Sequence, residues 1–330
     1  MLQTVLMSSN HMELSDRHAS RINAIKGIRI ENDRTIDLVK KIQLFKDTAL
    51  GGGESASASL TAPTRGGKTT IIDTFMSKHP PIREGAADRV PVVYVEVPSG
   101  ATTKTLGRAA LTALNHLNPE KGDGDFKRVE LVATLRRRGT TLIIFDELQR
   151  LVEKDRGKVS KNVSDWIQNL INNCRGICAV LLVGTTRARS VFAKNGHLIG
   201  RNDFHWEVEP YQRNPQQKKD WELYRAYLAN FDHQFVTVAD FSRSNFAKPD
   251  VAARIHAASL GYPGATAKLL QIAATDAIMQ GSNVIDNAIL ASAFDRLWKF
   301  SNAVALNPFT SDRPLLPQQV WKGPWEEILD

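Results

Sequence analysis

Residues 61–70 read TAPTRGGKTT, and this stretch decides how the rest of the chain is interpreted. It nearly fits the phosphate-binding pattern G-x-x-x-x-G-K-[ST], with Ala62 at the first glycine position. It follows a short strand and precedes a predicted helix, KTTIIDTFMSKH, a setting in which backbone N–H groups bind phosphate oxygens. The alternative is a chance match on a surface loop. Because alanine is the smallest departure from glycine, we expect the loop to tolerate it if φ at Ala62 is negative.

The pattern assigns roles to the residues of this loop. Lys68 is expected to reach the β- and γ-phosphates of ATP, and the Thr69 hydroxyl is expected to bind Mg²⁺. The predicted nucleotide-binding residues are Pro63, Thr64, Arg65, Gly66, Gly67, Lys68, Thr69 and Thr70. The predicted cofactors are therefore ATP and Mg²⁺.

A second motif, TLIIFDE at residues 141–147, is an apolar strand that ends in two acids. Asp146 is expected to complete the Mg²⁺ site, and Glu147 is expected to polarise the attacking water. Asp146 lies 78 residues after Lys68, which leaves room for the intervening helices and a strand. Acids also gather at helix N-termini for electrostatic reasons alone. Together, the two motifs favour a working site that hydrolyses ATP to ADP and phosphate.

Apolar strands and helical patterns alternate along the first two thirds of the chain. The strands VPVVYVEV (90–97), TTLIIFDE (140–147) and GICAVLLVGTT (176–186) are continuous apolar runs, as expected of strands buried on both faces. This alternation predicts an α/β fold, a mainly parallel sheet with helices on both faces. After residue 212 only helical patterns remain, which predicts a second, smaller, all-helical domain.

The predicted organisation has four parts. They are an N-terminal extension (1–30), an α/β nucleotide-binding domain (31–212), a helical lid domain (213–302) and an extended tail (303–330). The tail carries Trp321 and Trp325, aromatic anchors of the kind that dominate interfaces, and is expected to dock a partner. The alternative is that the tail folds back on its own domain.

Composition narrows the class of protein. The 330 residues are 42% hydrophobic, enough for a sizeable core. Lys and Arg number 43 against 35 Asp and Glu, and the charge of +8 suggests a polyanionic partner such as nucleic acid. Cys174 and Cys178 are too few for a disulfide framework or a zinc site. No apolar run reaches the roughly 20 residues of a membrane span and no secretory signal is evident, so we expect a cytoplasmic protein.

Two further segments resemble the AAA+ ATPase superfamily. AVLLVGTT ends in Thr185, and the resemblance implies that this residue senses the γ-phosphate or the lytic water. In HLIGRNDF, the resemblance implies that Arg201 is an arginine finger, which completes the site of a neighbouring subunit. Arg187 and Arg189 are rival candidates, and the other alternative for Arg201 is a plain surface arginine.

One feature of that superfamily is missing. Its lid domains often carry an arginine soon after a G-x-x-G turn, and in GYPGATAKLL the position holds Ala265. Lys268, one helical turn later, is a partial substitute. The missing arginine argues against closure of a lid on the nucleotide, and it does not argue against nucleotide binding.

Within the superfamily, the chain is similar to the TniB/TnsC-type regulators of DNA transposition over about residues 30–300. The similarity rests on the order of APTRGGKTT, PVVYVEVPSGATTKTLGRAALTAL, TLIIFDELQRL, AVLLVGTTRARSVF, LIGR and GYPGATAKLL. It implies ATP-dependent assembly on double-stranded DNA as a ring or helical filament. Such an assembly bridges a TniQ-type target-selection protein to a transposase, and whether an RNA-guided complex recruits it stays open. The alternatives are a helicase loader or initiator, and a nucleotide-binding scaffold with little turnover.

Candidate DNA contacts lie in two segments. The turn PSGATTK offers Thr103 and Lys104, groups that suit phosphates without reading bases, and Lys121 and Lys127 are expected to add a second contact. Such binding should weaken steeply with salt. A solvated surface lysine is the alternative for Lys104. The arginines of LRRRG (135–139) lie at a helix C-terminus, where the dipole favours cations, so we expect a structural role for them.

Overall fold

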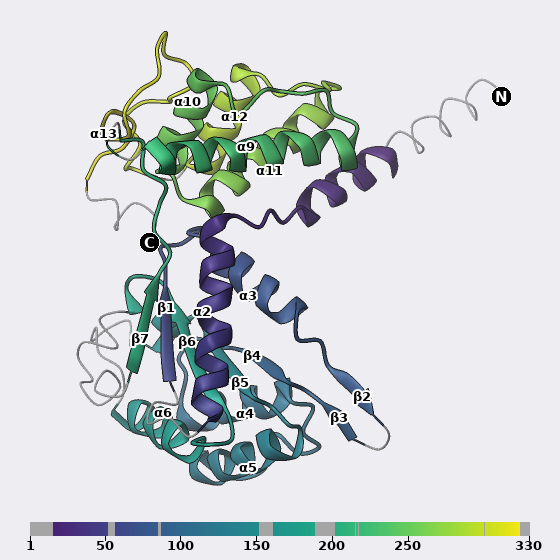
Figure 1. Cartoon of the computed structure of the whole chain (residues 1–330), viewed down its shortest axis with the longest axis vertical. Helices are drawn as coiled ribbons and strands as arrows, with labels where there is room; N and C mark the ends of the chain where they lie inside the picture. Colours follow the sequence, from purple (N-terminus) through teal and green to yellow (C-terminus); the bar gives the residue numbers. More distant parts are fainter. Residues whose placement is uncertain are drawn as a thin grey trace, which may run out of the picture. The chain divides into compact units, whose positions relative to one another are not determined.

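The computed structural model describes residues 16–51, 57–84, 87–151, 161–188, 202–214, 216, 218–299 and 301–323. The chain divides into two compact units, shown in Figure 1. An α/β unit comprises Arg34–Thr64 and Lys68–Val208, and a helical unit comprises Met1–Asp33, Arg65–Gly67 and Glu209–Leu329. The described N-terminal residues, 16–33, therefore group with the helical unit.

The α/β unit is built on a five-stranded sheet in the order β4-β5-β6-β1-β7, and every neighbouring pair is parallel. The strands are β1 (Ser57–Thr61), β4 (Val92–Glu96), β5 (Leu142–Asp146), β6 (Ala179–Gly184) and β7 (Asn202–Glu207). The three central strands, β5, β6 and β1, are buried along their whole length. This burial explains their apolar sequences, because parallel strands are covered on both faces.

Helices cover both faces of the sheet, as predicted. One core contains Ile143, Phe145, Val180 and Leu182 from the strands. It also contains residues of α4 (Thr103–Ala113), α5 (Gly124–Arg137) and α6 (Lys161–Asn173). The alternate residues Leu142, Ile144, Leu181 and Val183 enter a second core with α2 (Asp33–Leu50) and α3 (Lys68–Ser77). This alternation is the two-residue period of a strand.

Two strand features were not predicted. The edge strand β7 has the sequence NDFHWE, and such a half-polar run does not resemble a buried strand. A short antiparallel pair, β2 (Ile82–Glu84) and β3 (Ala87–Arg89), forms a separate two-stranded sheet. Its strands are three residues each, too short to give a periodic signal.

The helical unit contains the four long helices that the sequence predicted. They are α9 (Lys218–Ala239), α10 (Pro249–Ser259), α11 (Pro263–Met279) and α12 (Asn287–Leu297). Residues 16–27 are also helical, and Ile25, Ile28 and Ile30 enter the same core. Nowhere in the described part of the chain is a helix long and apolar enough to cross a bilayer.

The C-terminal segment is not an extended tail through residue 323, which corrects the sequence-based expectation for Trp321. Trp321 is 3% exposed, and its indole N–H donates to the carbonyl of Ala257 at 2.8 Å. Its ring meets that of Trp298 edge to face at 4.9 Å. Arg254 further anchors the segment by donating to the carbonyls of Pro308 and Ser311. An apolar ring with one N–H gains more from this pocket than from water. Trp325 lies outside the described residues.

Candidate nucleotide-binding site

The loop between β1 and α3 has the conformation expected of a phosphate-binding loop. Gly67 has a φ of +117°, which a residue with a side chain rarely adopts, and Arg65 has a φ of +62°. Lys68 is 8% exposed, and its ammonium donates to the carbonyls of Ala62 (2.8 Å) and Pro63 (3.2 Å). The lysine head is thus held against the loop itself.

Ala62 is accommodated for the reason that the sequence suggested. Its φ is not positive, and its side chain is fully buried in the core shared by α2, α3 and the sheet. Its N–H donates to the carbonyl of Gly184 on β6 at 3.3 Å. The methyl group fills space in the core and does not narrow the loop.

Helix α3 begins at Lys68, so Thr69 and Thr70 lie in its first turn. The N–H groups of a first turn have no partner within the helix, and the helix dipole is positive at this end. No acidic side chain occupies the first turn of α3. Thr69 is exposed, and its hydroxyl is the type of ligand that Mg²⁺ takes beside a phosphate.

Asp146, the last residue of β5, is buried and firmly oriented. One carboxylate oxygen, Oδ1, accepts the N–H of Glu147 at 2.7 Å, and the other, Oδ2, accepts the hydroxyl of Tyr94 at 3.0 Å. Burial, and next the negative charge of Asp146, raise the pKa of Tyr94. The phenol therefore stays protonated and donates. Sequence reasoning missed Tyr94 because it treated β4 as purely apolar.

Glu147 follows with a φ of +63° and is held by its own short helical turn, η1 (Leu148–Leu151). Oε2 of Glu147 accepts from the amide of Gln149 at 2.8 Å, and Nε of Arg150 lies 3.4 Å from the same oxygen. The amide oxygen of Gln149 accepts the N–H of Thr185 at 3.0 Å. Gln149 therefore links the predicted catalytic acid to the predicted sensor, a role that one sequence does not reveal.

Thr185 itself has an unused hydroxyl. It lies directly after β6, is 6% exposed, and its Oγ1 has no hydrogen-bond partner among the described residues. A buried hydroxyl without a partner is costly, so a site that supplies one is expected. A phosphate oxygen or an ordered water meets that need.

These groups meet because parallel strands end at the same edge of a sheet. β6 lies between β5 and β1, and each of the three carries part of the site at its C-terminal end. β1 leads to the phosphate loop, β5 to Asp146 and Glu147, and β6 to Thr185. Ligands of open parallel sheets bind at this edge. The chemistry of Thr69, Asp146 and Lys68 fits a magnesium–nucleotide complex.

The predicted arginine finger cannot be placed in this way. Arg201 and its rival Arg189 lie outside the described residues. The other rival, Arg187, is described and exposed. On α11, Ala265 is buried and Lys268 is exposed.

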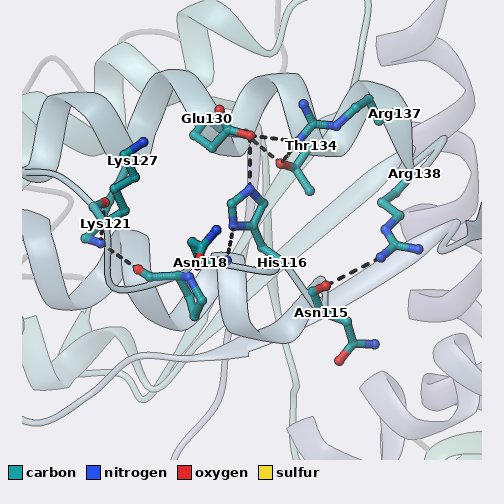
Figure 2. Close-up of polar contacts among 10 residues, drawn as sticks. Asn115, His116, Asn118, Lys121, Lys127, Glu130, Thr134, Arg137 and Arg138 are labelled. Atoms are coloured by element: carbon teal, nitrogen blue, oxygen red, sulfur yellow. Dashed lines mark hydrogen bonds and ion pairs between the residues drawn. The ribbon is translucent and has the colours of Figure 1, made fainter.

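The predicted DNA contacts divide into two groups. Lys104 in the first turn of α4 and Lys121 in the loop before α5 are exposed, and Thr103 is half-buried. Lys127 is 0% exposed, so its prediction as a direct DNA contact is wrong. Its ammonium lies under the loop and donates to the carbonyls of Pro119 (2.5 Å) and Lys121 (2.9 Å), as Figure 2 shows. Burial lowers its pKa.

Two of the three arginines at the end of α5, Arg137 and Arg138, make contacts compatible with the structural role that the sequence favoured. Arg137 pairs with Glu130 at 2.7 Å. Arg138 donates to the carbonyl of Asp88 in β3 at 3.2 Å. Figure 2 shows the pair of Arg137 with Glu130 and the contact of Arg138 with the carbonyl of Asn115 at 3.5 Å.

Comparisons with known proteins agree with this fold. Residues 47–206 match the family model described as the bacterial TniB protein. No curated protein matched the sequence. Among solved structures, the chain is similar to Cdc6p from Pyrobaculum aerophilum, with a TM-score of 0.55 and 12% identity over 81% of this chain and 68% of that one.

Two structures with DNA are also similar. The Orc1 protein of Aeropyrum pernix in complex with DNA gives a TM-score of 0.53 and 16% identity, over 82% of this chain and 66% of that one. Drosophila ORC bound to DNA gives a TM-score of 0.51 and 12% sequence identity, over 85% of this chain and 66% of that one. The chain thus spans about two thirds of the length of each. At these identities the similarity shows the fold alone, which is that of the AAA+ ATPases.

Proposed function

Because residues 47–206 match the TniB family model and the fold is that of the AAA+ ATPases, we propose that the protein is an ATP-dependent, DNA-binding regulator of DNA transposition. It assembles on double-stranded DNA as a ring or helical filament in the cytoplasm. It links a TniQ-type target-selection protein to the transposase, and hydrolysis controls assembly and disassembly. The convergence of Lys68, Asp146, Glu147 and Thr185 at one sheet edge carries the proposal.

In the proposed reaction, each residue of this edge has one task. Lys68 leaves the carbonyls of its own loop and binds the β- and γ-phosphates. Thr69 and Asp146 would hold Mg²⁺, which would neutralise charge on the phosphates. Glu147 accepts a hydrogen bond from the attacking water and aligns it with the γ-phosphorus. The hydroxyl of Thr185 donates to that water or to a γ-phosphate oxygen.

Assembly on DNA is part of the same proposal. Arg201 from one subunit completes the site of the next, and DNA lies against Thr103, Lys104 and Lys121. Two of the structures that share the fold are described as DNA complexes, which is compatible with this role. The transposase is proposed to bind the last residues, 324–330, which include Trp325.

Electron microscopy of the purified chain with duplex DNA tests the proposal. Samples with no nucleotide, with ADP and with a slowly hydrolysed ATP analogue are compared. Rings or filaments that need both DNA and the analogue are expected. Single subunits under all three conditions would refute assembly. Binding assays against a transposase and against a replicative helicase then separate a transposition regulator from a helicase loader.

A scaffold with little turnover is the second candidate, and one observation favours it. Oε2 of Glu147 already accepts from Gln149 and lies near Arg150, so the acid is engaged before any water arrives. Steady-state hydrolysis, measured with and without DNA, separates the two. A rate that stays at background in both conditions supports the scaffold.

A further inference from the structure

The connection between α4 and α5, residues 114–123, has a defined shape that its own backbone does not supply. Asn115 and Gly122 both have positive φ, at +52° and +81°. One backbone hydrogen bond is described within the connection, from the N–H of Lys121 to the carbonyl of Asn118 at 3.3 Å, and side chains add further contacts. Lys127 holds the carbonyls of Pro119 and Lys121 from beneath.

A second anchor holds the start of the same connection. Nε2 of His116 lies 3.0 Å from the carboxylate of Glu130, and Nδ1 of His116 accepts the N–H of Asn118 at 3.1 Å. The imidazole thus donates to α5 and shapes the loop at the same time (Figure 2). Arg137 and His116 lower the pKa of Glu130, Arg137 having the larger effect, which keeps the carboxylate charged.

The connection and the first turn of α4 form one packed surface. A Cβ on Gly124 would collide with the hydroxyl of Thr103, and a Cβ on Gly107 would lie 2.8 Å from Cβ of Lys127. The indole N–H of Trp166 on α6 donates to the carbonyl of Gly124 at 2.7 Å. The exposed cations Lys104 and Lys121 therefore project from segments that are locked together.

The charges nearby fit a phosphate backbone. Lys104, Arg108 and Lys121 are exposed, and Arg108 pairs only at 3.4 Å with the exposed Glu120. Burial lowers the pKa of Lys127, the charge of Glu120 raises it, and the charges of Lys104 and Arg108 lower it further, so three cations and one carboxylate lie close together. Preformed cationic surfaces bind polyanions without the entropy cost of ordering a loop.

We propose that Lys127 is a positioning residue of this surface: its buried ammonium fixes the 114–123 connection so that Lys121 and the start of α4 bind successive phosphates of duplex DNA. The inference rests on the proposed DNA-binding function. It assigns to Lys127 a role different from a phosphate contact, because its two hydrogen bonds go to loop carbonyls.

A double-mutant cycle tests this role. Affinity for a fluorescent DNA duplex is measured by anisotropy, with the slowly hydrolysed ATP analogue, for Lys127→Met, Lys121→Ala and the double variant. We expect each single change to weaken binding by ~10-fold and the double variant to be no weaker than Lys127→Met alone, because Lys121 acts only from the fixed loop. Lys46→Met is the matched control, since Lys46 is a buried lysine on α2, away from this connection, and should leave the affinity unchanged.

Two results would overturn the inference. If Lys127→Met binds DNA as the wild type does, its role is structural only. If the two effects multiply, Lys127 is an independent DNA contact. A wild-type chain that binds no duplex would instead refute the proposed function itself, so the two failures are distinguishable.

Glu130→Met, which removes the acceptor for the imidazole of His116, keeps the test decisive if Lys127→Met does not fold. The side chain of Glu130 is 26% exposed, so this change is easily accommodated. It removes a negative charge near the surface, and charge alone would strengthen DNA binding. Loss of the fixed loop predicts weaker binding, again with no further loss in the Lys121→Ala background. Stronger binding would contradict the inference.

Discussion

At the scale of single residues, the site depends on hydrogen bonds that orient charged groups. Both oxygens of Asp146 accept a hydrogen bond, and Gln149 joins Glu147 to Thr185. These contacts come from residues far apart in sequence or from one tight turn. Neither kind produces a pattern, which explains why the sequence indicated the acids and not the groups that hold them.

Replacing Glu147 with glutamine should stop hydrolysis without preventing nucleotide binding. The amide still accepts hydrogen bonds, but it cannot accept a proton from the attacking water. We therefore expect turnover to fall by at least ~100-fold. Phosphate release and nucleotide affinity are the two measurements. Glu120→Gln, an exposed change outside the site, is the control. Normal turnover of Glu147→Gln would remove this residue from the mechanism.

Replacing Tyr94 with phenylalanine should weaken Mg²⁺ binding selectively. The ring keeps its packing while Asp146 loses the donor at 3.0 Å. Partners of metal ligands typically change metal affinity by 10- to 100-fold, so the Mg²⁺ concentration for half-maximal hydrolysis should rise by ~10-fold. Excess Mg²⁺ should restore the rate. An unchanged Mg²⁺ titration would show that the hydroxyl does not orient the ligand.

At the scale of elements, burial determined what the sequence could predict. β1, β5 and β6 are buried throughout, so their apolar runs identified them. β7 is an edge strand that pairs with β1 alone, and its polar residues gave no strand signal in the sequence. Lys127 illustrates the same limit for side chains, because the sequence does not distinguish a buried lysine from an exposed one. Only the structure shows that its ammonium donates to two loop carbonyls.

Helix α10 should make the stability of the protein sensitive to acid. Nε2 of His256 donates to the carbonyl of Tyr211 at 2.8 Å, and Nδ1 has no partner among the described residues. Burial lowers its pKa to about 4. The unfolded chain therefore binds a proton near pH 6.5 that the folded chain excludes until about pH 4, and stability falls as the pH drops through that window.

From pH 7 to pH 5 we expect a loss of about 2 kcal/mol in the free energy of unfolding from this group. Urea denaturation followed by tryptophan fluorescence measures it, since Trp221 lies 5.8 Å from the imidazole. In His256→Gln the amide replaces the donor and does not titrate, so that part of the pH dependence should disappear. The same slope in both proteins would assign the acid sensitivity to other groups.

At the scale of the whole molecule, a truncation separates folding from partner recruitment. Because the proposed function assigns residues 324–330 to transposase binding, their removal should leave stability and ATP hydrolysis unchanged. It should abolish transposase capture in a pull-down. In contrast, Trp321→Ala removes a buried ring and should destabilise the protein by about 3–5 kcal/mol. Capture that survives the truncation would place the transposase contact elsewhere.

The division of the chain into two units also determines the order in which they can fold during synthesis. The helical unit needs the segment before residue 34, the helices after residue 208 and Trp321, whereas the continuous stretch from 34 to 208 supplies nearly all of the α/β unit. A ribosome releases the chain from its N-terminus, and domains fold as they emerge. The nucleotide-binding sheet can therefore be complete while translation continues. The isoleucines of the first segment stay exposed until the helices after residue 208, whose core they join, have been synthesised.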